Sequence, residues 1–327
     1  MNRPARDSRR WPLPASVVVA LAVIASCSSG SGAKLSLPSS PVAPTPTTAA
    51  AAPAGPVPDC GNPRASFAPA GPLPGPDALP TGSYMAKVRQ SGRLRVAVSA
   101  DTLLFGFSDP VDGQLKGFDI DVARQVAAAI FGDPNKIEFR VVTYAQRIPA
   151  LKAGDVDLVA DVMTINCTRW AQISFSSEYF TAGQKILVRK DSPVTDINAL
   201  NGRQVCAAKG STNIEELKKY PKVKVVPVDD ISDCMVVFQQ GGTDAVTGDD
   251  TVLAGFVAQD PYAKVVGPAI TDEPYGLGIA KQNTDFVRFV NAVLEKMRTD
   301  GTWKQLYSKN GLGTPPEPPA PVYGRTP

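Results

Sequence analysis

Short β-branched segments alternate with amphipathic helical segments through most of this chain, and this alternation restricts the fold more than any other feature. RLRVAVSAD at residues 93–101 has the composition of a strand, and so does KIEFRVVTY at residues 136–144. Between them, FDIDVARQVAAAIFG at residues 118–132 places apolar side chains along one face of a helix. Such alternation predicts an α/β fold with a mostly parallel sheet.

The alternation continues in a second series. RIPALKAG at residues 147–154 predicts a helix, because Pro149 suits a first turn and Gly154 suits a C-terminal cap. VDLVADV follows as a strand, and from QKILVRK at residues 184–190 onward another set of strands and helices begins. The sequence therefore predicts two α/β lobes, each with its own sheet.

Composition excludes several classes of function. The net charge of +3 comes from residues 1–26, which carry four arginines and one aspartate; in the remaining sequence acidic and basic residues balance. The sequence contains no stripe of basic residues of the kind that indicates nucleic-acid binding. The chain has no histidine, which excludes Ser-His-Asp and Cys-His catalysis and metal ligation by imidazole. We expect neither a metal nor a cofactor.

The first residues have the pattern of an export signal. Arginines precede an apolar run from Ala15 to Ala25, which is too short to span a bilayer comfortably. Ile24-Ala25-Ser26-Cys27 then resembles a bacterial lipobox, which implies that residues 1–26 are a signal peptide and that Cys27 is lipidated after cleavage. The alternative is an ordinary secretory peptide with a chance cysteine. We expect a protein anchored by lipid to the cell membrane, facing the extracytoplasmic side.

Two segments lack the composition of a folded core. Residues 27–84 are rich in Pro, Ala, Thr, Ser and Gly, and they predict a lipid-anchored stalk. Residues 313–327 are rich in proline and predict a disordered tail. Because Cys60 lies within the first segment, part of the stalk is expected to be fastened to the folded body.

Six segments occur in a fixed order along the chain: GFDIDVARQVA, RIPALKAGDVDLVADVMTI, CTRWAQISFSSEYF, AAKGSTNIEEL, DAVTGDDTVLAG and VLEKMRTDGTWKQLY. Together they resemble the polar amino-acid-binding proteins of ABC importers, the family-3 extracellular solute-binding group. The resemblance covers about residues 85–310 and implies a two-lobed fold of the periplasmic-binding-protein type (type II). One lobe takes residues 85–180 and 277–312, the other takes 184–270, and two strands cross between them as hinges.

The resemblance implies a monomeric receptor rather than an enzyme. Such a protein traps a free polar L-amino acid by lobe closure and delivers it to an ABC permease. A second hypothesis makes the same trap a sensor that reports ligand to a membrane signalling protein. A third makes it a dehydratase-type enzyme, which needs an acid with a tuned pKa in the cleft.

The α-groups of the ligand have candidate partners. The resemblance assigns Arg169 to the α-carboxylate, which a guanidinium matches with two hydrogen bonds. Ser211 and Thr212 begin a helix after a strand and form a candidate anion site, or a simple helix cap. Asp249 and Thr164 match the family's partners of the α-ammonium. Asp250 is the alternative to Asp249, although we favour it as a helix cap.

Arg147 and Asp101 bear on which side chain is bound. QRIPALKAG is similar to glutamate- and aspartate-binding members, in which the arginine meets the side-chain carboxylate of the ligand; Arg147 therefore favours an acidic ligand. Asp101 aligns with an acidic position near the cleft, where it could accept amide N–H groups or pair with Arg147. The sequence leaves Glu, Asp, Asn and Gln open.

Five cysteines are present, and lipidation of Cys27 leaves four, which an exported protein can pair. A zinc site is the alternative, but the spacing does not match a metal finger. Cys206 ends a strand of the second lobe and Cys234 lies on a helix two elements later, which predicts the pairs Cys206–Cys234 and Cys60–Cys167.

Overall fold

A computed structural model describes residues 58–326. The predicted signal peptide, the lipidation site Cys27 and the first half of the predicted stalk lie outside the described residues. Among the residues that are described, no helix has the length and apolar character needed to cross a membrane.

The first lobe is built on a five-stranded sheet in the order β5-β1-β6-β14-β7. β1 pairs in parallel with β5 and β6, whereas β14 runs antiparallel to β6 and β7. β14 comes from the C-terminal part of the chain, after all the residues of the second lobe. The bounds are β1 (Leu94–Val98), β5 (Ile137–Val141), β6 (Leu158–Val159), β7 (Ile173–Phe175) and β14 (Gly278–Ala280).

Helices flank this sheet, and the predicted ones occur where their patterns lie. The apolar face of α2 is fully buried, and the helix ends at Gly132, whose φ of 73° is unfavourable for other residues. α1 and the small sheet β2-β3-β4 were not predicted. The bounds are η1 (Pro76–Ala78), α1 (Tyr84–Ser91), β2 (Asp101–Thr102), β3 (Gly106–Ser108), β4 (Leu115–Lys116), α2 (Phe118–Phe131), α3 (Arg147–Ala153), α4 (Cys167–Trp170), α8 (Thr284–Thr299) and α9 (Thr302–Lys309).

The second lobe has a sheet in the order β10-β9-β11-β8-β12. β9 pairs in parallel with β10 and β11, while β8 runs antiparallel to β11 and β12. The bounds are β8 (Phe180–Arg189), η2 (Ile197–Leu200), β9 (Gln204–Ala208), α5 (Thr212–Glu216), η3 (Leu217–Lys219), β10 (Lys224–Val228), α6 (Ile231–Gln239), β11 (Ala245–Asp249), α7 (Asp250–Gln259) and β12 (Ala263–Val266).

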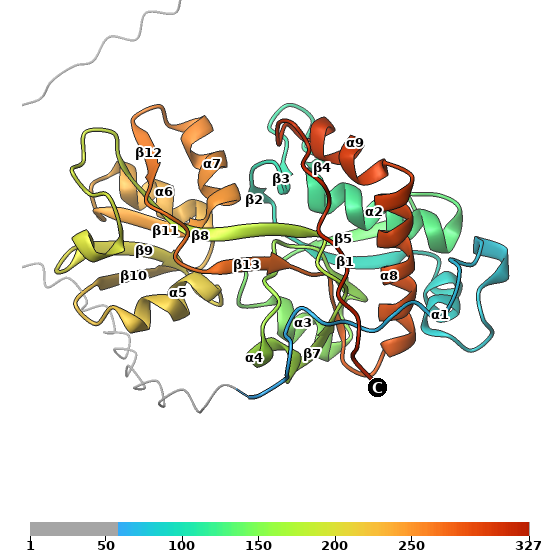
Figure 1. The fold of residues 1–327 in the computed structure, drawn as a ribbon. Helices are drawn as coiled ribbons and strands as arrows, with labels where there is room; N and C mark the ends of the chain where they lie inside the picture. The colour runs from blue at the N-terminus through green and yellow to red at the C-terminus, as the bar shows by residue number, and fades with distance from the viewer. Residues whose placement is uncertain (1–57, 327) are drawn as a thin grey trace, which may run out of the picture. The chain divides into compact units, whose positions relative to one another are not determined.

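Two antiparallel strands connect the lobes. The first half of β8 pairs with β13 (Asp272–Tyr275), with Gly183 opposite Asp272 and Phe180 opposite Tyr275. Figure 1 shows both strands running from the sheet of one lobe to that of the other. The α/β fold with two lobes and two crossing strands, predicted from the sequence, is confirmed.

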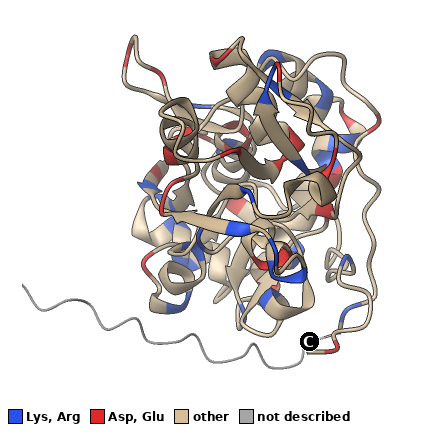
Figure 2. Cartoon of the chain, turned by 90° about the vertical axis from the view of Figure 1, so that its left-hand side faces the viewer, with Lys and Arg blue, Asp and Glu red and all other residues tan. Residues whose placement is uncertain are grey.

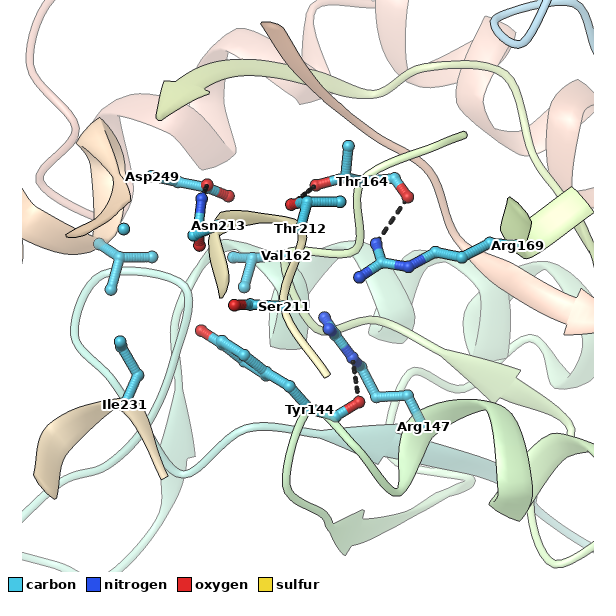
Figure 3. A pocket seen from close by; sticks show the side chains of 12 residues that line it. Tyr144, Arg147, Val162, Thr164, Arg169, Ser211, Thr212, Asn213, Ile231 and Asp249 are labelled. Carbon is cyan, nitrogen blue, oxygen red and sulfur yellow. Dashed lines mark hydrogen bonds between the residues drawn. The ribbon is translucent and has the colours of Figure 1, made fainter. Parts of the chain in front are cut away.

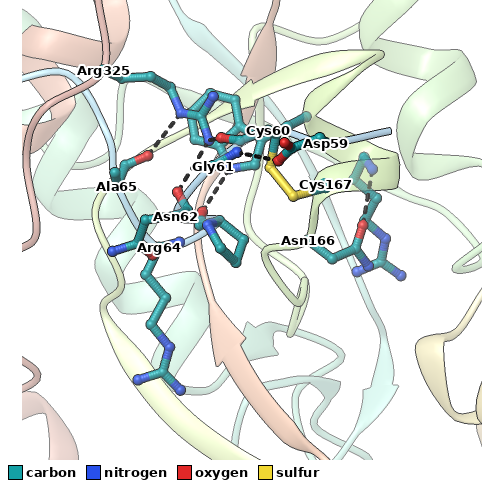
Figure 4. The surroundings of a disulfide bond; sticks show 12 residues. Asp59, Cys60, Gly61, Asn62, Arg64, Ala65, Asn166, Cys167 and Arg325 are labelled. Atoms are coloured by element: carbon teal, nitrogen blue, oxygen red, sulfur yellow. Dashed lines mark hydrogen bonds between the residues drawn. A yellow bond between two sulfur atoms is a disulfide. The ribbon is translucent and has the colours of Figure 1, made fainter. Parts of the chain in front are cut away.

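The segments at both ends of the described chain pack against the first lobe. Phe67 is buried, and a parallel bridge joins Ser66 to Tyr323. The guanidinium of Arg325 lies 3.7 Å from the ring centre of Trp170 and donates a hydrogen bond to the Ala65 carbonyl (Figure 4). The predictions of a stalk over residues 58–84 and of a disordered tail over residues 313–326 are therefore wrong, because each segment supplies partners for the other.

Both predicted disulfide pairings are present in the structure. Cys60 and Cys167 have Cα atoms 5.3 Å apart, and Cys206 and Cys234 have Cα atoms 5.6 Å apart. The first bond joins the N-terminal segment to the start of α4, as Figure 4 shows. The second joins β9 to α6 within the second lobe.

Basic and acidic residues are interspersed over the described elements. Figure 2 shows both colours mixed along the helices and loops of that view, without a continuous basic band. This distribution agrees with the balanced composition and gives no indication of a nucleic-acid surface.

Candidate functional site

Residues from both lobes enclose a small cavity beside the crossing strands. The space inside it that a water molecule could occupy is only about 10 Å³, so the two lobes fit tightly around it. Tyr144, Arg147 and Arg169 from the first lobe face Ser211, Thr212 and Asp249 from the second (Figure 3). The full lining consists of Tyr144, Arg147, Val162, Thr164, Arg169, Ser211, Thr212, Asn213, Ile231, Gly248, Asp249 and Val252.

Arg147 is held rigidly although it begins a helix. Only 2 % of the residue is exposed, so it does not extend into water as a surface arginine would. Its Nε donates to the Tyr144 carbonyl at 3.1 Å, and its Nη1 donates to the Asp161 carbonyl at 2.7 Å. The guanidinium also lies 4.3 Å from the centre of the Tyr144 ring, within range of a cation–π contact.

Arg169 approaches the cavity from α4. The side chain of Asn166 caps this short helix by accepting the Arg169 N–H, and the guanidinium donates to the Thr164 carbonyl at 2.7 Å. Burial and the nearby charge of Arg147 lower the pKa of Arg169 to about 9. Two cations are thus held close together in a largely buried site.

Both arginines meet the second lobe at one carbonyl. Nη2 of Arg147 and Nη2 of Arg169 donate to the oxygen of Gly210, at 3.3 and 3.1 Å. A Cβ atom on Gly210 would lie 2.6 Å from the Cα atom of Ala145, and the φ of Gly210 is +74°. Only glycine therefore allows the lobes to approach this closely at the arginine pair.

Each guanidinium keeps hydrogen-bond donors for a ligand. An arginine has five N–H donors. Within the described chain Arg147 uses three, on Nε, Nη1 and Nη2, which leaves two; Arg169 uses two, on Nη1 and Nη2, which leaves three. Neither forms an ion pair with a carboxylate among residues 58–326. The pair is therefore suited to bind anionic oxygens.

Asp249 supplies a negative group on the other side of the cavity. It ends β11, is 6 % exposed, and accepts hydrogen bonds from Asn213 at 2.8 Å and from the Tyr275 hydroxyl at 2.7 Å. Burial, and secondly the charge of Glu273, raise the pKa of Asp249 to about 7. Within residues 58–326 this buried carboxylate has no salt bridge with a cation, so it is suited to accept an ammonium group.

The three hydroxyl residues, Thr164, Ser211 and Thr212, all line the cavity, and Ser211 also forms the helix cap that was one of its two readings from the sequence. Ser211 caps α5: its Oγ accepts from Ile214 N and donates to the Ala208 carbonyl. α5 has only five residues, so its dipole is small. Thr164 and Thr212 have hydroxyl oxygens 3.4 Å apart, and these two residues come from opposite lobes.

Two aspartates considered from the sequence lie outside the lining. Asp101 accepts hydrogen bonds from Ser99 Oγ and from Ser232 N, where α6 begins, so it connects the lobes. The carboxylate of Asp250 accepts from Gly183 N on the crossing strand, and α7 starts there without a side-chain cap. Asp249, not Asp250, lines the cavity, and the cap expected from Asp250 is absent.

Val162 has a strained backbone at the cavity wall. Its φ of +38° is rare for a β-branched residue. Its N–H donates to the carboxylate of Asp119 at 2.7 Å, and Asp119 also accepts from the Tyr179 hydroxyl. Burial raises the pKa of Asp119 to about 6. The buried carboxylate thus holds the segment between β6 and Thr164 in place.

Several lining residues were missed from the sequence. Asn213 lies two residues after Ser211 in a motif already recognised, so its motif could have indicated it. Tyr144 supplies an aromatic ring to the lining three residues before Arg147, and the motifs quoted from the sequence did not single it out. Val162, Ile231, Gly248 and Val252 carry no chemistry that sequence could single out.

Comparison with known proteins gives the family. Residues 94–313 match the bacterial extracellular solute-binding proteins, family 3. The chain belongs to this family. The expectation of a binding protein rather than an enzyme is confirmed, and an extracytoplasmic location follows from the family.

Individual members of family 3 are similar over most of their length. The ABC transporter glutamine-binding protein of Bacillus subtilis is 36 % identical over 227 residues, which cover 69 % of this chain and 83 % of that protein. The glutamate-binding protein of Corynebacterium glutamicum is 33 % identical over 236 residues, covering 68 % and 79 %.

Solved structures of solute-binding proteins share the fold. A mutant of the arginine-binding protein of T. maritima has a TM-score of 0.66 at 32 % identity, covering 69 % of this chain and 97 % of that one. An ancestral arginine-binding protein bound to glutamine has a TM-score of 0.64 at 37 % identity, covering 67 % and 98 %.

Proposed function

We propose that this family-3 protein binds a free polar L-amino acid with an acidic or amide side chain and delivers it to an ABC importer permease. Arg169 binds the α-carboxylate, Arg147 binds the side-chain oxygens, and Asp249 binds the α-ammonium. The names of relatives that bind glutamine and glutamate support this ligand class.

The observation that carries the proposal is the charge arrangement of the cavity. Two buried arginines with unused N–H donors face a buried aspartate across one small space. A zwitterion placed there would neutralise both signs, and an unpaired buried charge is costly. One guanidinium is enough to bind the α-carboxylate. The second arginine therefore favours a ligand with a further carboxylate or amide oxygen.

Calorimetry of the purified protein against all twenty amino acids tests the proposal. We expect saturable binding of at least one of Glu, Asp, Gln and Asn, and no binding of amino acids with apolar side chains. Ligand recovered after incubation should be chemically unchanged. Conversion of the ligand would support the dehydratase hypothesis, and binding of none of the twenty would refute the receptor.

Replacing Arg147 by methionine should change the selectivity of the site. A hydrogen bond between charged partners contributes about 1.5–3 kcal/mol, against about 0.5–1.5 kcal/mol for a neutral acceptor. Arg147→Met should therefore weaken Glu and Asp roughly tenfold more than Gln and Asn. Dissociation constants for the four ligands, measured by calorimetry, give the ratio.

Lys116→Met is the matched control for that variant. It removes one positive charge from the first lobe, at a side chain that is 44 % exposed and paired with Asp109 and Asp112. The control should leave all four affinities nearly unchanged. If Arg147→Met weakened all four ligands equally, the role of Arg147 as the side-chain reader would be wrong.

We also propose that Cys27 anchors the protein to the membrane by lipid. The small residues before Cys27 in the sequence support this proposal. Cys27→Ala should leave the precursor uncleaved and without palmitate, as measured by labelling with radioactive palmitate and by the mass of the N-terminal peptide. An unmodified Cys27 thiol in the wild-type protein would contradict the anchor.

A further inference from the structure

Glu273 lies on a hinge strand and contacts two residues of the cavity lining, Thr164 and Thr212, without lining the cavity itself. It is the second residue of β13, opposite Ala182 of β8, and only 2 % of it is exposed. Its charge raises the pKa of Asp249 and opposes the lowering of the pKa of Arg169, so it acts on both groups assigned to the ligand. No cation forms a salt bridge with it among the described residues.

Threonine hydroxyls provide the hydrogen bonds of this carboxylate. Its Oε2 accepts from Thr164 Oγ1 at 2.5 Å and from Thr212 Oγ1 at 2.7 Å. Its Oε1 accepts from Thr271 Oγ1 at 2.5 Å. One oxygen atom on the hinge strand therefore joins a threonine of the first lobe to a threonine of the second.

These bonds fix what the two threonines can offer to a ligand. A hydroxyl has one proton to donate and two lone pairs with which to accept. Since Thr164 and Thr212 both donate to Glu273, each presents only lone pairs to the cavity. Such oxygens can accept from an ammonium group but cannot donate to a carboxylate. The hydroxyl of Thr212 is then unsuited to donate to a carboxylate, and only backbone N–H groups at this helix start could do so.

We propose that Glu273 is a specificity-determining residue that orients Thr164 and Thr212 as acceptors and thereby selects ligands with an α-ammonium group. This inference rests on the proposed function. Together with Asp249, the two threonines then form an ammonium subsite made only of acceptors, opposite the arginine pair. Because Thr164 and Thr212 belong to different lobes, this subsite is complete only when the lobes are closed.

The test compares L-glutamate with glutarate, which lacks only the α-ammonium group. Calorimetry measures both dissociation constants. A ligand that binds too weakly for direct titration is measured by its displacement of the amino acid that binds most tightly. In Glu273→Gln, we expect the preference for glutamate over glutarate to fall at least tenfold, while Glu273→Asp keeps part of it. Equal weakening of both ligands would overturn the proposal, because a merely structural role lowers both alike.

Two further variants keep the result interpretable. Glu178→Gln changes another buried carboxylate, which accepts from Thr181 near the same strands but lies outside the cavity, and the preference should stay unchanged. Thr212→Val leaves Glu273 intact. It should weaken the binding of glutamate and leave the binding of glutarate unchanged. The opposite result would mean that Thr212 donates to the ligand carboxylate. If the wild type binds no amino acid, the proposed function fails; if it binds and the preference persists in Glu273→Gln, only this inference fails.

Discussion

Arg169→Ala and Asp249→Ala should each weaken every amino-acid ligand by several hundredfold. Every such ligand presents the same α-carboxylate and α-ammonium, so the loss should not depend on the side chain. Arg169 is 7 % exposed and Asp249 is 6 % exposed. Removing one partner of a buried charge pair costs about 3–5 kcal/mol, because the charge on the ligand is then buried without a partner.

Affinity for four ligands, measured by calorimetry on folded variants, checks this expectation. Arg140→Ala and Asp155→Ala serve as controls, since they remove the same charges from an exposed ion pair on the first lobe. These controls should bind within a few-fold of the wild type. If both site variants retained full affinity, the ligand would have to bind elsewhere, and our placement of the site would be wrong.

In the proposed function, Arg169 recognises the amino-acid core of the ligand and Arg147 recognises its side chain. Both arginines donate to the Gly210 carbonyl, so closure brings the second lobe against both at once. At the arginine pair, the lobes thus meet through one backbone oxygen that accepts hydrogen bonds from two cations. A ligand that occupies their remaining N–H donors adds stability to the closed form without displacing this contact.

Much of the fold could be predicted because its signals are local. α2 and α3 occur where apolar periodicity and terminal glycines predicted them, and the alternation of elements gave both lobes. The packing of the chain ends could not be predicted in the same way. Arg325 meets Trp170 and Ala65 across more than 150 residues of sequence, and prolines alone resemble a disordered tail.

The residues of the candidate site could likewise be predicted from the sequence only in part. Arg147, Arg169 and Asp249 lie in recognisable motifs, and the structure brings them to one cavity. Asp101 lies in such a motif as well, but it is outside the lining and contacts the start of α6. Glu273 was not predicted from the sequence, because its proposed role depends on a crossing strand. This strand brings Glu273 into contact with residues 164 and 212, which belong to different lobes. No local pattern encodes that meeting.

Asp161 carries the second large expected effect, and this effect depends on pH. The residue is 1 % exposed, and neither carboxylate oxygen has a hydrogen-bond partner within the described chain. Burial raises its pKa to about 7; Arg147 and Arg169 oppose this shift, whereas Asp119 and Asp101 add to it. Tyr144 and Tyr179 are also close enough to feel its charge.

The sign of the effect follows from proton binding. Because the pKa of Asp161 is higher in the folded chain than the ordinary value of 3.8, the folded state binds more protons between about pH 4 and pH 7. The free energy of unfolding therefore falls as the pH rises through this window, and the full penalty is present above pH 7. A neutral asparagine removes the penalty while keeping the shape of the side chain.

Asp161→Asn should therefore stabilise the protein at pH 8, by roughly 2–4 kcal/mol, and clearly less at pH 5. Urea unfolding with the disulfides intact, followed by tryptophan fluorescence at both pH values, measures the difference. Asp155→Asn, at a side chain that is 43 % exposed, should show little change at either pH. A gain for Asp161→Asn that is equal at both pH values would mean that ionisation of Asp161 does not cause the penalty. A loss at pH 8 would mean that the ionised carboxylate has a stabilising partner in the folded protein. Either result would contradict the expectation, because a desolvated and unpaired charge favours unfolding as it ionises.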